Sequence, residues 1–171
     1  MIMLDIAYLA ETAEHDHAIE DINAEAFGPG RYARAAYKIR EGGPHERALS
    51  FVAVHDGQVV ATVRLTRVAA GSGRALLLGP LAVKPAFKDR GIGRALVRVA
   101  IEAARAAGSP AVILVGDEPY YGPLGFRRIP ARRIVMPRPV DPNRLLIHEI
   151  SEGALDALQG VMVHADHAVP A

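Results

Sequence analysis

Residues 76–93, LLLGPLAVKPAFKDRGIG, combine an apolar strand pattern, a loop interrupted by prolines and a glycine-rich turn that opens a helix rich in Ala and Arg. Backbone N–H groups in the first turn of a helix have no intrahelical partner, and the helix dipole places partial positive charge behind them. Gly91 and Gly93 lie where such groups would be exposed. The stretch therefore predicts an anion-binding loop, with phosphate as the expected ligand.

Two common phosphate loops do not fit this turn. A dinucleotide-binding fingerprint needs G-x-G-x-x-G or A, and Leu96 occupies its last position. A P-loop needs Gly-Lys followed by Ser or Thr, which the chain lacks. What remains is Lys88 with glycines three and five residues later, a pattern that a tight turn beside a packed helix would also satisfy.

A second signature lies in residues 111–126, AVILVGDEPYYGPLGF. It consists of a short apolar strand, a loop and a Tyr-Tyr-x-x-Leu-Gly-Phe segment. The two signatures, in this order and at this spacing, resemble the acetyl-CoA pyrophosphate loop and the Tyr-x-x-x-Gly-Phe segment of the GCN5-related N-acetyltransferase (GNAT) superfamily. The resemblance is to its bacterial subgroup and covers roughly residues 4–163. Lys88 replaces the usual Arg or Gln, and Pro119 lies in a segment that is shorter than usual.

This resemblance implies an α/β fold with a mixed, centrally splayed β-sheet flanked by helices. Local patterns agree with it. Residues 50–55 and 58–67 form two strand patterns joined by Asp56-Gly57, a strong hairpin signal. Pro80 lies inside a third strand and has no N–H to donate, so the sheet should be bulged or interrupted there. A helix over residues 92–107 would connect that strand to a parallel one at residues 111–115. Helices are also expected over residues 14–26 and 31–40.

Length, composition and charge restrict the classes of protein to which this chain can belong. The chain has 171 residues, half of them hydrophobic, which predicts one domain spanning residues 1–171. A net charge of +1 gives no reason to expect nucleic acid or an anionic membrane as a partner. The absence of cysteine excludes an acyl-cysteine intermediate, so acyl transfer would be direct. The N-terminus lacks the basic region of a signal peptide, which favours a cytoplasmic location. The seven histidines have no spacing that predicts a metal site.

The resemblance also assigns roles to individual residues. The ones expected to bind acetyl-CoA, the acetyl donor, are Leu81, Ala82, Val83, Lys88, Asp89, Arg90, Gly91, Ile92, Gly93 and Arg94. The amide of Val83 would stabilise the oxyanion, and Tyr121 would protonate the departing thiolate; Tyr120 takes that role if the register is shifted by one. The general base stays open among Asp117, Glu118, Glu25 and His55.

The sequence therefore predicts an N-acetyltransferase that moves the acetyl group of acetyl-CoA directly to a primary amine. The alternative is a catalytically inactive acyl-CoA-binding or regulatory module of the same fold. The identity of the acceptor cannot be inferred from the sequence. A homodimer formed through the apolar C-terminal region is compatible with the pattern.

Overall fold

The computed structural model describes residues 4–168, so the first and last three residues of the predicted domain lie outside it. Nine strands form a sheet in the order β1-β2-β3-β4-β5-β8-β6, and β9 pairs with both β3 and β7. The strands are β1 (Ala7–Ala10), β2 (Phe51–His55), β3 (Gln58–Gly71), β4 (Gly73–Val83), β5 (Ala111–Val115), β6 (Arg127–Arg128), β7 (Ile134–Val135), β8 (Leu145–Glu149) and β9 (Leu158–His164). The α-helices are α1 (Asp16–Phe27), α2 (Ala35–Arg40), α3 (Ile92–Ala106) and α4 (Glu118–Tyr121).

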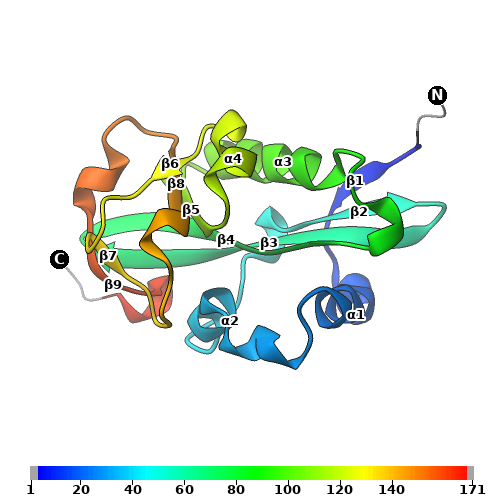
Figure 1. The fold of residues 1–171 in the computed structure, drawn as a ribbon, viewed down its shortest axis with the longest axis horizontal. Helices are drawn as coiled ribbons and strands as arrows, with labels where there is room; N and C mark the ends of the chain where they lie inside the picture. The colour runs from blue at the N-terminus through cyan, green and yellow to red at the C-terminus, as the bar shows by residue number, and fades with distance from the viewer. Residues whose placement is uncertain (1–3, 169–171) are drawn as a thin grey trace.

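Helices cover both faces of the sheet (Figure 1): α3 lies on one face, and α1 and α2 lie on the other. Successive residues of β4 point to opposite faces, and they enter two separate cores as a result. Leu76 and Leu78 join the core under α3, whereas Leu77 joins a second core with Ile113 and Ile147. Both cores therefore run through the same central strands.

The predicted hairpin and its continuation are confirmed. Strands β2 and β3 pair through His55 and Gln58, and the turn between them uses positive φ at Asp56 (49°) and Gly57 (76°). Asp and Gly tolerate that conformation better than most residues, which is why the dipeptide is a turn signal. Strands β3 and β4 then form the long central hairpin, closed by the turn at residues 71–73.

The predicted interruption at Pro80 is also present. Leu65 pairs with Leu78 and Val63 pairs with Leu81, so that Arg64 alone lies opposite two residues, Gly79 and Pro80. This is a β-bulge, in which one strand gains a residue and bends. The bulge comes shortly after the residues of β4 that pair with its parallel neighbour β5.

One predicted helix is broken. Residues 31–40 were expected to be continuous, but a 3₁₀-helix over Pro29–Ala33 and the short helix α2 are separated by Arg34. Arg34 has extended backbone angles (φ −71°, ψ 149°), and its guanidinium carbon lies 4.2 Å from the centre of the Phe27 ring. The break therefore turns a cationic side chain back over the end of α1. None of the described helices is long and apolar enough to cross a membrane.

Candidate active site

The parallel strands β4 and β5 separate after a short contact. Their ladder contains the pairs Leu76 with Val112 and Leu77 with Ile113. β4 then continues through the bulge to Val83, while β5 ends at Val115. Because both strands carry unpaired backbone along the gap, a ligand with amide groups can pair there as an added strand.

Two cavities meet in this gap. The first, of about 620 Å³, lies between the separating strands and is called the splay cavity. The second, of about 560 Å³, lies over the glycine-rich turn and is called the loop cavity. Both are lined by Phe27, Leu81 and Tyr120, so these three residues mark the junction between them.

The loop cavity gathers almost all the residues that the sequence predicts to bind the cofactor. Leu81, Ala82, Val83, Lys88, Asp89, Gly91, Ile92, Gly93 and Arg94 line it. Arg90 is exposed and does not line it. The sequence did not single out Ala26 and Phe87, which also line this cavity. Their apolar side chains could be found only once α1 and the turn after β4 were placed together.

The backbone of residues 81–83 is not equivalent at all three positions. The N–H of Lys84 donates to the carbonyl of Val60 at 2.8 Å, and Ala82 is the partner of Thr62. Since hydrogen bonds alternate along an antiparallel pair, the N–H and C=O of Ala82 face β3. Those of Leu81 and Val83 consequently face the gap. A ligand in the gap would meet the amides of Leu81 and Val83, with Ala82 contributing only to the wall.

The glycine-rich turn has the geometry that an anion site needs. Asp89 and Gly91 have positive φ (62° and 80°), and Gly91 is the N-cap residue of α3. The helix that follows has 15 residues, long enough to present a substantial dipole at this end. A Cβ added at Gly93 would lie 2.9 Å from Oη of Tyr120, which explains the absence of a side chain there.

The two adjacent tyrosines occupy different places. Tyr120 lies at the junction of the cavities, with the guanidinium carbon of Arg94 5.0 Å from its ring centre. Tyr121 lines only the splay cavity of the two, and its ring packs against Gly116 and edge-on to Phe126. Burial, with smaller contributions from Tyr120 and Asp117, raises the pKa of Tyr121 to about 12. Its phenol therefore stays protonated well above neutral pH.

The predicted base candidates are not brought together. Asp117 lines the splay cavity, where its Oδ1 accepts a hydrogen bond from Nε of Arg144 at 3.1 Å. Glu118 pairs with Arg128 at 3.4 Å, outside both cavities. Glu25 is exposed, and His55 packs against Phe87 without lining either cavity.

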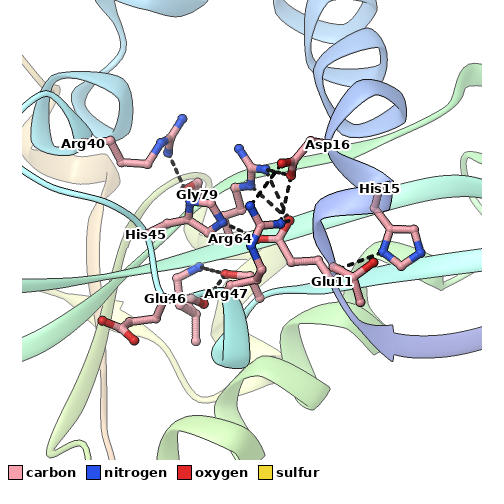
Figure 2. A network of polar contacts seen from close by, with 12 residues as sticks. Glu11, His15, Asp16, Arg40, His45, Glu46, Arg47, Arg64 and Gly79 are labelled. Atoms are coloured by element: carbon pink, nitrogen blue, oxygen red, sulfur yellow. Dashed lines mark hydrogen bonds and ion pairs between the residues drawn. The ribbon is translucent and has the colours of Figure 1, made fainter.

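A buried ionic network under the bulge escaped the sequence analysis (Figure 2). The side chain of Glu11 is fully buried and contacts His45 and Arg64, the latter at 3.2 Å. Burial by itself would raise the pKa of Glu11, but the hydrogen bonds and charges of His45 and Arg64 outweigh it and leave that pKa lowered. Arg64 is the residue opposite the bulge. A charged residue inside the apolar strand pattern was the signal that could have revealed the network.

The bulge receives a further contact from the same face of the sheet. Nη1 of Arg40 donates to the carbonyl of Gly79 at 3.3 Å, a bond visible in Figure 2. Arg64 also pairs with Asp16 at 3.3 Å, and Asp16 with Arg47 at 2.9 Å. The bulge that opens the gap is thus braced by charged side chains from α1, α2 and the segment before β2.

Comparison with known proteins agrees with this geometry. Residues 12–126 match the family described as Acetyltransferase (GNAT) family. The chain therefore belongs to the GNAT family of acetyltransferases. It is similar to the uncharacterized N-acetyltransferase YjhQ of Escherichia coli K12, with 31% identity over 112 residues, which are 63% of this chain and 62% of YjhQ. It thus matches less than two thirds of YjhQ. With the uncharacterized N-acetyltransferase YhbS of the same strain it shares 25% identity over 87% of this chain and 90% of that protein.

Solved structures show the same fold. The crystal structure of E. coli YhbS in complex with CoA has a TM-score of 0.79 and 23% identity, covering 98% of this chain and 93% of that one. A GNAT family acetyltransferase from Brucella melitensis, in complex with acetyl-CoA, has a TM-score of 0.60 and 25% identity, covering 85% of this chain and 97% of that one. The mixed, centrally splayed sheet predicted from the sequence is confirmed.

Proposed function

We propose that this protein transfers the acetyl group of acetyl-CoA directly to a primary amine. The observation that carries the proposal is the continuous cleft formed by the two cavities. One arm holds the glycine-rich turn at the start of α3, and the other opens between the separated strands. Two relatives that carry the name N-acetyltransferase, and related structures with CoA or acetyl-CoA, support it.

The loop cavity would hold the cofactor. The N–H groups at the start of α3 and the charge of Lys88 suit a pyrophosphate, and Arg94 adds a second cation beside it. The pantetheine arm would run along β4 and pair with the backbone amides that face the gap, those of Leu81 and Val83. The sequence also predicted that Arg90 binds the cofactor. Its side chain is exposed and lies outside the loop cavity, so it would contribute only positive charge at the surface beside the loop.

The thioester would lie at the junction of the cavities. Leu81 lines both of them, whereas Val83 lines only the loop cavity. We therefore assign oxyanion stabilisation to the N–H of Leu81, next to the bulge, and pantetheine binding to the N–H of Val83, for which the sequence had predicted the oxyanion role. A preorganised donor of this kind is typically worth ~3 kcal/mol in the transition state.

The acetyl group would pass from the thioester to the amine in one direct transfer. The amine nitrogen bonds to the carbonyl carbon, the carbon–sulfur bond breaks, and the thiolate takes a proton from the phenol of Tyr121. The amine loses its proton to solvent and the phenolate is reprotonated from it, which leaves an N-acetylated amine and CoA. Asp117 is the predicted base that lines the cavity, and its Oδ1 accepts a hydrogen bond from Arg144 there.

The proposal also includes the domain organisation, the cellular location and the oligomeric state of the protein. We propose that the chain acts as one domain, which is supported by the two cores that share the central strands. We also propose that it acts in the bacterial cytoplasm. A homodimer through the C-terminal region is supported by Val135 and Val161, neighbours on β7 and β9 whose exposed fractions are 51% and 61%.

The test is a turnover assay with purified protein, acetyl-CoA and a panel of primary amines. Release of the CoA thiol, together with the mass of an N-acetylated product, is the expected result. Acetyl-CoA binding without turnover on any amine would contradict the catalytic role and favour the inactive acyl-CoA-binding module. No binding of acetyl-CoA would contradict both.

A further inference from the structure

Three arginines line the splay cavity and do not line the loop cavity. Arg34 comes from the break before α2, whereas Arg138 and Arg144 come from the segment between β7 and β8. These segments are about a hundred residues apart in the chain, and the fold brings them to one cavity wall. All three side chains are exposed to the cavity or to solvent, so a ligand can reach them.

The carboxylates in the same wall leave two of the three arginines without an ion pair. Asp117 is paired with Arg144, and Oδ1 of Asp141 accepts a hydrogen bond from the backbone N–H of Asn143 at 2.9 Å. Within residues 4–168, no carboxylate lies within ion-pair distance of Arg34 or Arg138. Two guanidinium groups thus face the cavity with their hydrogen-bond donors available.

Arg34 is held in place without a charge partner. Its guanidinium stacks on Phe27, one of the three residues at the junction of the cavities, and this stacking restricts its position in the cavity wall. Burial, followed by the nearby charge of Arg144, lowers the pKa of Arg34. Both effects disfavour the charged form of Arg34 relative to water, and an anion bound in the cavity would counteract them.

We propose that the acceptor is a small primary amine that also carries an anionic group, a carboxylate or a phosphate, which Arg34 and Arg138 bind while the amine reaches the thioester at Leu81. This inference rests on the proposed acetyl transfer and names its substrate class. Arg144, already paired with Asp117, forms the adjoining wall. A guanidinium binds either anion through paired hydrogen bonds, so the chemistry is shared between the two.

The anion in question is distinct from the phosphates of the cofactor. Lys88 and Arg94 line the loop cavity and not the splay cavity, while Arg34 and Arg138 line the splay cavity and not the loop cavity. The two pairs of cations therefore belong to different cavities, one for the phosphates of the cofactor and the other for the anion of the acceptor.

The experiment uses matched pairs of amines that differ only in the anion. Phenylalanine is compared with phenethylamine, and O-phosphoethanolamine with ethanolamine, by calorimetric binding to the protein saturated with CoA and by thiol release with acetyl-CoA. We expect at least one anionic member to bind about tenfold or more tightly than its neutral partner. A preference in the first pair identifies a carboxylate, and one in the second pair a phosphate. Equal or absent binding of both members in both pairs overturns the proposal.

Substitutions test whether Arg34 and Arg138 cause the preference for the anionic amine. Arg34→Gln and Arg138→Gln should each reduce binding of the anionic member about tenfold, with a higher KM and little change in the neutral partner. Arg105→Gln, at the far end of α3 and outside both cavities, is the matched control. Arg34→Lys keeps the charge and should retain part of the preference, and melting temperatures identify any variant that is misfolded. A preference that survives Arg34→Gln and Arg138→Gln combined in a folded protein overturns the assignment.

Acetyl-CoA binding separates this inference from the proposed function. If acetyl-CoA binds and neutral amines are acetylated as well as anionic ones, acetyl transfer stands and the anionic acceptor is wrong. If acetyl-CoA does not bind, the proposed function fails, and the substrate class falls with it.

Discussion

Leu77 of β4 and Ile113 of β5 form the last pair of the parallel ladder, and the cleft begins where this pair ends. Both side chains are almost fully buried, at 2% and 0% exposed, so the two strands are fixed together on one side of the opening. On the other side, the bulge at Gly79 and Pro80 bends β4 away. The gap is therefore formed by the strand pairing of the sheet itself.

Removing the phenol of Tyr121 should impair acetyl transfer. If Tyr121 protonates the departing thiolate, Tyr121→Phe should lower kcat by about a hundredfold or more with a small change in the KM for acetyl-CoA, because general acid catalysis contributes ~10²-fold to 10⁴-fold. Steady-state thiol release measures it. Tyr120→Phe is the matched control, one residue away at the junction of the cavities. A larger loss of kcat in Tyr120→Phe would reassign the acid to Tyr120.

The pH profile tests the same residue independently. Because the pKa of Tyr121 is about 12 in the folded protein, its phenol stays protonated over the usual assay range. The rate should therefore rise with pH as the acceptor amine loses its proton, with no alkaline fall up to about pH 10, the ordinary pKa of tyrosine. An alkaline fall with a midpoint near pH 10 that disappears in Tyr121→Phe would contradict the raised pKa.

Adding a methyl group at Gly93 should weaken cofactor binding. The Cβ would lie 2.9 Å from Oη of Tyr120 and 3.6 Å from the Val83 side chain, in the cavity that the pyrophosphate is proposed to occupy. Gly93→Ala should raise the Kd for acetyl-CoA about tenfold while the fold is kept, because Ala is favoured over Gly in a helix by ~1 kcal/mol. Gly122→Ala, which has open space around its Cβ, is the control. Unchanged affinity in Gly93→Ala would place the phosphates elsewhere.

The buried network under the bulge should contribute to stability. Glu11→Gln leaves His45 and Arg64 without their buried carboxylate partner, and breaking such a pair typically costs about 3 kcal/mol. Urea denaturation at neutral pH measures the loss. Glu102→Gln removes an exposed carboxylate beside Arg105 and should change the free energy of unfolding by less than about 1 kcal/mol. Equal effects of the two substitutions would show that the network is not a stabilising element.

The pH dependence of that stability has a definite sign. The pKa of Glu11 is lowered in the folded protein from its usual 4.5, so its contribution is fully present above that value and is lost as pH falls through the lower, folded pKa. The difference in stability between the natural protein and Glu11→Gln should therefore shrink as the solution is acidified below about pH 4.5. A difference that stays constant down to about pH 3 would contradict the lowered pKa.

Much of the fold could be predicted because its signals are local. The hairpin at Asp56 and Gly57 and the bulge at Pro80 follow from what single residues can do with their backbone. The start of α3 was also predictable, since Gly91 and Gly93 mark the first turn of the helix. The anion site that they indicate stays a prediction. The break at Arg34 was not, because its stacking on Phe27 depends on how α1 and α2 are placed.

The distribution of roles within the site needed the three-dimensional structure. The sequence does not distinguish the backbone amides of Leu81, Ala82 and Val83 as ligand-binding groups. Only their pairing with β3 shows which of these amides face the gap. Likewise, Arg34 and Arg138 are far apart in the chain, and no spacing relates them. Contacts between residues far apart in the sequence depend on the topology of the fold. Local residue patterns contain little information about that topology.

The most direct test of the account is a calorimetric titration of the purified protein with acetyl-CoA. Because the loop cavity, the bulge and the gap are all present in the fold, the account predicts saturable binding to one site per chain, with a Kd in the micromolar range and competition by CoA. Absence of binding at millimolar acetyl-CoA would contradict it: the turn at residues 88–93 would then be only a helix start, and the role proposed for Tyr121 would have no basis.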